Sequence, residues 1–151
     1  MINSDDWYEE NALGNIHDNF EGGEDVIYGL LNVWDGNDFL RVYANHSNYL
    51  NTDSLAHPSV FISKYAYEKH GDYSLKYKSA ADYELFLRFK GNGCSFKYIP
   101  KSLANFSIGG MCSSHNGYYE TLKIKYSYNI INKLRYLRML YIRKLLVWVK
   151  K

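Results

Sequence analysis

The sequence predicts an α/β fold, because short runs of β-forming residues alternate with helical patterns and are separated by turn signals. Of the 151 residues, 46% are hydrophobic and only two are prolines, which is the composition of a folded domain and excludes a disordered chain. The length corresponds to one domain.

The first predicted strand is the apolar segment DVIYGLLNVW at residues 25–34. The Asp-Gly-Asn-Asp sequence at 35–38 predicts a tight turn that brings residues 39–44 back as a hairpin partner. Three further short strands are predicted at residues 59–62, 95–99 and 103–108, with Pro100 ending the second of them.

Helical patterns occupy the intervening segments. Ser63 is expected to cap one helix that stops at Gly71, and Ser79 is expected to cap the next. Helices are predicted at residues 11–20, 64–70, 80–90 and 118–151.

The charge is divided unevenly along the chain. Residues 1–117 hold nine Lys and Arg against fifteen Asp and Glu, a net charge of −6, whereas residues 118–151 carry +8 with Glu120 as their only acid. We therefore divide the chain into a body, 1–117, and a basic C-terminal helix, 118–151. The total of +2 argues against a nucleic-acid-binding protein.

The N-terminus has neither the basic nor the apolar region of a signal peptide, and Cys94 and Cys112 form no disulfide framework. A reducing, cytoplasmic location is expected.

Asp5 and Asp6 are adjacent carboxylates in an Asn-Ser-Asp-Asp turn. One or two carboxylates at such a turn suit Mg²⁺ or Mn²⁺, which keep open positions for substrate phosphates. Taken alone, the pair fits an ordinary helix N-cap better.

Asp82 lies with Leu85, Phe86 and Phe89 on one face of its predicted helix. A carboxylate at the rim of a buried face is suited to act as a general base. Ser79 and Asp82 also have capping-box spacing, and the spacing alone favours the cap.

Two other features are weaker candidates. His57 begins the segment HPSVF, and a lone histidine is more often structural than a ligand. Gly109 and Gly110 could allow the backbone to approach a phosphate.

Six segments in order resemble a known family. They are NSDDWY at 3–8, DVIYG at 25–29, HPSVF at 57–61, YEKHGDY at 67–73, AADYELFLR at 80–88 and FSIGGMCS at 106–113. Together they resemble the C-terminal half of a bacterial inverting family-two glycosyltransferase with the GT-A fold, of the polysaccharide-biosynthesis type.

The resemblance implies a partial GT-A-like mixed sheet with flanking helices, a nucleotide-sugar donor, a divalent metal and a saccharide or lipid-linked acceptor. It implies that Asp5 and Asp6 bind the metal and that Asp82 is the general base. It also places four residues around the same substrate cleft: His57, Arg88, Gly109 and Gly110. The family's first acidic metal position is Asn3 here, and Cys112 replaces a serine of its glycine-rich loop.

The resemblance also implies that the N-terminal nucleotide-binding half is not part of this chain, so weak binding of nucleotide sugars by the chain alone is expected. The alternative is a non-catalytic carbohydrate- or partner-binding module rich in tyrosine.

The basic C-terminal helix has apolar residues at a helical period, among them Leu122, Leu134, Tyr141 and Trp148. A basic amphipathic helix of this kind favours an anionic membrane surface, here the inner face of the plasma membrane. Packing against the N-terminal half that the resemblance implies, with the lysines in solvent, explains the pattern equally well.

Overall fold

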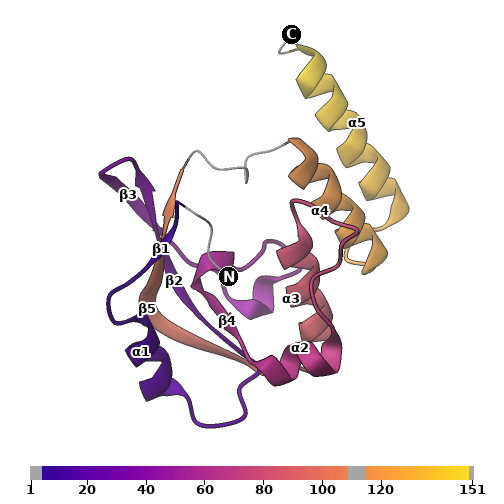
Figure 1. Cartoon of the computed structure of the whole chain (residues 1–151). Coiled ribbons are helices and arrows are strands. Elements are labelled where there is room, and N and C mark those ends of the chain that lie inside the picture. Colours follow the sequence, from indigo (N-terminus) through magenta and orange to yellow (C-terminus); the bar gives the residue numbers. More distant parts are fainter. Residues whose placement is uncertain (1–4, 109–114, 150–151) are drawn as a thin grey trace.

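The α/β prediction is confirmed. A computed structural model describes residues 5–108 and 115–149, and Figure 1 shows a mixed sheet with helices around it. In these residues the strands are β1 (Trp7–Tyr8), β2 (Val26–Asp35), β3 (Asp38–Tyr43), β4 (Val60–Ile62) and β5 (Phe96–Ser107). The sheet order is β1-β5-β2-β3, and β4 also pairs with β2.

Strand β2 is the centre of the sheet. It runs parallel to β5 and antiparallel to β3 and β4, while β1 pairs antiparallel with the end of β5. The predicted hairpin is confirmed: Gly36, between β2 and β3, has a φ of 56°, which glycine adopts without strain. This hairpin forms one edge of the sheet.

Strand β5 corrects the prediction of two separate strands, because it continues through Pro100. Its register against β2 shifts after Tyr28 and again after Leu30, so Pro100 lies in an irregular stretch where its missing N–H does little harm. Gly29 lies opposite this stretch, and a Cβ there would come within 2.6 Å of the Lys101 carbonyl oxygen. Position 29 therefore requires glycine, because β2 and β5 approach too closely there for a side chain.

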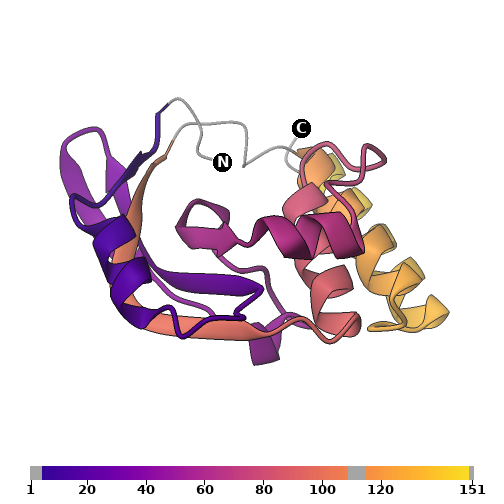
Figure 2. The ribbon, with the colours of Figure 1, turned by 60° about the horizontal axis from the view of Figure 1, so that its bottom comes forward.

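Five α-helices lie in the described residues: α1 (Ala12–Asn19), α2 (Lys64–His70), α3 (Ala81–Gly91), α4 (His115–Ser127) and α5 (Lys133–Val149). Two short 3-10 helices, η1 (Ser47–Tyr49) and η2 (His57–Ser59), lie between β3 and β4. Helix α1 rests on β5, on the side of the sheet away from α2 to α5 (Figure 2). The Ser63 cap of α2 is confirmed by a hydrogen bond from the Ala66 N–H at 3.1 Å.

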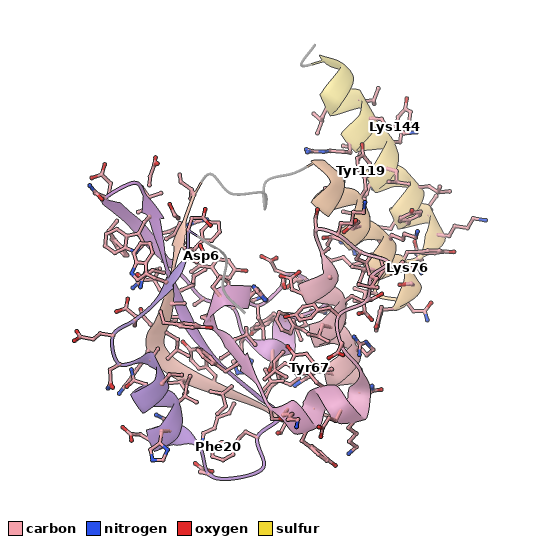
Figure 3. All side chains as sticks on the ribbon, in the orientation of Figure 1. Asp6, Phe20, Tyr67, Lys76, Tyr119 and Lys144 are labelled. Carbon is pink, nitrogen blue, oxygen red and sulfur yellow. The ribbon has the colours of Figure 1, made fainter. Side chains whose placement is uncertain are left out.

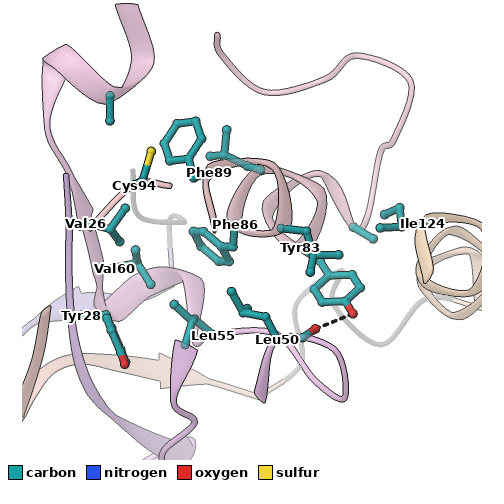
Figure 4. Packing of buried hydrophobic residues seen from close by; sticks show 14 of the residues in the cluster. Val26, Tyr28, Leu50, Leu55, Val60, Tyr83, Phe86, Phe89, Cys94 and Ile124 are labelled. Carbon is teal, nitrogen blue, oxygen red and sulfur yellow. Dashed lines mark hydrogen bonds between the residues drawn. The ribbon is translucent and has the colours of Figure 1, made fainter. Parts of the chain in front are cut away.

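The hydrophobic core lies between the sheet and α3 (Figure 4). Phe86 and Phe89 of α3 are fully buried against Val26 of β2 and Val60 of β4. Helix α4 contributes Ile124 to the same core. This packing fixes the position of α3, including its first turn, relative to the sheet.

The prediction of one helix over 118–151 is wrong. Helix α4 ends at Ser127 and α5 begins at Lys133, and between them Asn129 has a φ of 56°, a left-handed conformation that interrupts a helix. Residue 117, the boundary expected from the charge distribution, lies inside α4, whose Leu122 is buried. None of the helices in the described residues is long and apolar enough to cross a bilayer.

Candidate functional site

A pocket of about 620 Å³ opens between the sheet and the start of α3. Its apolar wall includes Leu31 and Val33 of β2 and Phe106 of β5. Its polar lining comes from β3, η2 and the segment that enters α3, and includes Arg41, His57, Tyr73, Lys78 and Asp82.

The strand pairing explains the sheet side of this pocket. Alternate residues of a strand point to the same face, so Leu31 and Val33 share one face of β2. Across the hairpin, Leu31 pairs with Tyr43 and Val33 with Arg41, and paired side chains lie on the same face. Strand β3 therefore places a cation and a phenol beside the apolar floor.

Asp82 lies in the first turn of α3 and is half-buried in the pocket lining. Its Oδ1 accepts a hydrogen bond from the Tyr83 N–H at 2.8 Å. The capping box with Ser79 does not form, because the N-cap residue of α3 is Ala80 and makes no side-chain cap bond. Burial raises the pKa of the Asp82 carboxyl above its usual value, against smaller effects of the Tyr83 N–H and of His57.

His57 faces the same pocket from η2. Its Nε2 and the hydroxyl of Tyr73 form a hydrogen bond of 3.2 Å. Burial lowers the pKa of the imidazole, while the charges of Asp82 and Asp6 oppose that effect. The structure thus brings the predicted residues His57 and Asp82 to one pocket and places Asp6 within electrostatic reach of His57.

Asp5 and Asp6 differ in their surroundings. Asp5 is exposed in a turn, whereas Asp6 is buried and its Oδ1 accepts a hydrogen bond from the Ser107 N–H at 3.4 Å (Figure 3). The turn continues into β1, so the alternative that this pair caps a helix does not hold. Within residues 5–108 and 115–149, no three His, Cys, Asp or Glu side chains gather in a metal-binding group.

Arg88 does not line the pocket. Its guanidinium donates hydrogen bonds to the backbone carbonyls of His70, Gly71 and Asp72, and its Nε lies 3.1 Å from Glu84 Oε1. The side chain therefore joins the end of α2 to α3. Gly109 and Gly110, the other predicted substrate-binding residues, lie outside the described residues.

Sequence reasoning missed five polar residues at or beside the pocket. Four of them line it, and nothing in their sequence neighbourhood distinguishes them from exposed residues of the same type: Arg41, Tyr43, Tyr73 and Lys78. The fifth is Glu120, whose carboxylate binds the backbone N–H groups of residues 78–80. Its position as the only acid in the basic segment was the available signal.

The fold and the pocket define an α/β protein with a carboxylate and an imidazole at an apolar pocket rimmed by cations. Such a carboxylate can take a proton from a bound hydroxyl, and Arg41 and Lys78 can bind an anionic group. No known family model matches the sequence, and no curated protein matches it.

Proposed function

We propose that this chain is the catalytic, acceptor-binding part of an inverting glycosyltransferase with a GT-A-like fold, which transfers a sugar from a nucleotide-sugar donor to a hydroxyl acceptor in cell-surface polysaccharide synthesis. The observation that carries the proposal is Asp82: a half-buried carboxylate of raised pKa at a pocket of about 620 Å³. The ordered motifs that resemble the family supply the reaction type.

In this proposal Asp82 accepts the proton of the acceptor hydroxyl while that oxygen attacks the anomeric carbon of the donor. The bond from that carbon to the diphosphate breaks, and the nucleoside diphosphate leaves with the electron pair. A raised pKa makes the Asp82 carboxylate a stronger base. His57, kept neutral by its lowered pKa, can hydrogen-bond the acceptor without competing for the proton.

Arg41 and Lys78 supply positive charge at the pocket for the donor's phosphates. Asp5 and Asp6 would hold the divalent metal, Mg²⁺ or Mn²⁺, which neutralises charge on the departing diphosphate. Two adjacent carboxylates fit such an ion, because Mg²⁺ takes one or two protein carboxylates and completes its shell with water and phosphate oxygens.

We further propose that α5 holds the protein against an anionic membrane on the cytoplasmic side, where lipid-linked acceptors are found. Helix α5 contains five Lys and Arg and no acid. It also exposes a row of apolar residues: Leu134, Leu137, Tyr141 and Leu145. Its position beyond α4, at the outside of the molecule, leaves this row uncovered by the body (Figure 1).

A binding experiment tests the pocket directly. NMR spectra of the labelled chain are recorded with UDP, GDP or dTDP plus Mg²⁺, and separately with a panel of oligosaccharides. We expect shifts at His57, Tyr73 and Asp82 with an acceptor saccharide, and only weak effects with nucleotides. Saccharides that bind elsewhere or not at all would argue against the proposal.

A second candidate is a carbohydrate-binding module without catalysis, and a cluster of aromatic rings favours it. Trp34 lies 6.0 Å from Trp7 and 5.4 Å from Phe39 between ring centroids. Trp7 and Phe39 are exposed, and flat exposed rings bind sugar faces. Saccharide binding that is lost in Trp7→Ala and kept in Asp82→Asn would favour the module.

A further inference from the structure

The carboxylate of Glu120 binds the segment that leads into α3. Glu120 Oε2 accepts hydrogen bonds from the N–H groups of Lys78 at 3.0 Å, Ser79 at 2.8 Å and Ala80 at 3.0 Å, and Oε1 also accepts from Lys78 at 3.0 Å. Glu120 belongs to α4, about forty residues further along the chain. Three consecutive backbone donors therefore converge on one side chain from a different helix.

These bonds hold the segment immediately before α3, which begins at Ala81 with Ala80 as its N-cap residue. The side chain of Ala80 makes no cap bond, and within the first turn the Tyr83 N–H binds Asp82 Oδ1. A negative charge at this end is also favoured by the helix dipole. Burial raises the pKa of Glu120, but the hydrogen bonds from the three N–H groups together lower it by more. The pKa of Glu120 therefore lies below its usual value, and the side chain stays ionised.

The same segment forms part of the pocket. Lys78 and Ser79 line the pocket, and Asp82 follows Ala80 by two residues in the first turn of α3. A change in the position of residues 78–80 must move that first turn. We infer that Glu120 is a positioning residue for this site: by binding the N–H groups of residues 78–80 it fixes the place of the Asp82 carboxylate in the pocket. This role rests on the proposed function of Asp82.

A control variant should loosen α4 without removing the bonds of Glu120. Lys125 provides one, because it joins α4 to the body at a different place. Lys125 Nζ donates a hydrogen bond to the Thr52 carbonyl oxygen at 2.6 Å and lies 5.8 Å from the centroid of the Tyr83 ring. Lys125 is not among the residues that line the pocket, and the bonds to residues 78–80 come from Glu120. The Lys125→Met variant therefore loosens α4 without removing the contact to the start of α3, and it is the matched control.

The charge of Asp82 acts on His57, which provides a measurement that does not depend on turnover. The pKa of His57 is measured by NMR in buffer with EDTA for the full chain, Glu120→Gln, Lys125→Met and Asp82→Asn. Asp82→Asn should lower the pKa of His57, because it removes a negative neighbour. We expect Glu120→Gln to lower it by at least half as much, and Lys125→Met to leave it unchanged.

A pKa of His57 that is unchanged in Glu120→Gln would overturn the inference, as would equal shifts in Glu120→Gln and Lys125→Met. If Glu120→Gln does not fold, Glu120→Asp replaces it, since it keeps the charge but shortens the reach by one carbon, and the same criteria apply. A shift in Glu120→Gln without any sugar transfer by the protein would leave the positioning role standing and contradict the proposed function alone.

Discussion

Asp82 and His57 act on each other across the pocket although they come from different elements, α3 and η2. The imidazole lowers the pKa of the Asp82 carboxyl, and the carboxylate raises that of His57, while burial acts against the charged form of both groups. Neither side chain is held in place by a direct bond to the other: Asp82 bonds the Tyr83 N–H, and His57 bonds Tyr73. Both side chains line the pocket, so a ligand bound there would meet both of them.

The first prediction concerns the pH dependence of Asp82→Asn. The folded protein raises the pKa of Asp82 above its usual value of 3.8, so ionisation of this group costs stability as the pH rises through the folded pKa. Asparagine removes the charge and keeps an acceptor for the Tyr83 N–H. We expect a higher Tm than wild type at pH 7 and no difference below about pH 3.5, measured by calorimetry across this range.

A capping role for Asp82 predicts the opposite sign at pH 7, a lower Tm, because a charge that favours the helix start would be lost. Ser79→Ala is the control for this experiment. It retains the Ser79 backbone N–H that binds Glu120, and a large loss of stability in it would restore the capping box as an explanation.

The second prediction separates a structural from a substrate-binding role for Arg88. A lysine side chain cannot donate to all three carbonyls that the guanidinium binds, and each hydrogen bond lost contributes about 0.5–1.5 kcal/mol. We expect the Tm of Arg88→Lys to fall by about 5 °C, with saccharide binding at the pocket unchanged. A normal Tm together with weaker saccharide binding would give Arg88 the substrate-binding role expected from the family resemblance.

The third prediction concerns the metal. Asp6→Asn should weaken Mn²⁺ binding by about tenfold or more, because a carboxylate ligand is lost. Isothermal titration of Mn²⁺ into the chain measures this, with Glu10→Gln, an exposed acid close by in the sequence, as the control. Equal Mn²⁺ affinity in the wild type and in both variants would remove Asp6 from the metal site.

The fourth prediction concerns α5 and anionic membranes. Arg135 and Arg138 are exposed on α5, and each basic residue near such a surface contributes about 1 kcal/mol. Replacing both with Glu should reduce flotation with phosphatidylserine vesicles by about tenfold or more, and added salt should weaken the wild type. The control is the same change at Lys69 and Lys76, which are exposed elsewhere. Equal losses in both double variants would show that only net charge matters.

The confirmed fold predictions rest on local sequence signals. The turn at Gly36 and the caps of α2 at Ser63 and Gly71 are set by neighbouring residues, and these elements appear where the sequence places them. The strand through Pro100 and the break at Asn129 escaped prediction because tertiary packing decides them. Helical periodicity alone continues through residues 128–132, although α4 packs into the core and α5 does not.

The residues of the site divide in the same way, into those that local sequence signals indicate and those that only tertiary contacts reveal. Asp82 was found because it heads the apolar face of its predicted helix, whereas His57 was placed at the cleft only by the family resemblance. Glu120 escaped because its role depends on a contact between segments some forty residues apart. The capping box failed for a related reason: the Ser79 N–H, which Asp82 would bind in that motif, binds the distant Glu120 carboxylate, and Asp82 binds the Tyr83 N–H.

The decisive assay for the catalytic role of Asp82 is sugar transfer by this chain joined to the nucleotide-binding half of a family-two glycosyltransferase. Labelled UDP-, GDP- and dTDP-sugars are supplied with Mn²⁺ and a lipid-linked or saccharide acceptor, and NMR reports the anomeric configuration of the product. We expect transfer with inversion, and a turnover about 10²-fold or more lower in Asp82→Asn, the range for loss of a general base. Near-normal turnover in Asp82→Asn, a product of retained configuration, or no transfer by the wild type would contradict it.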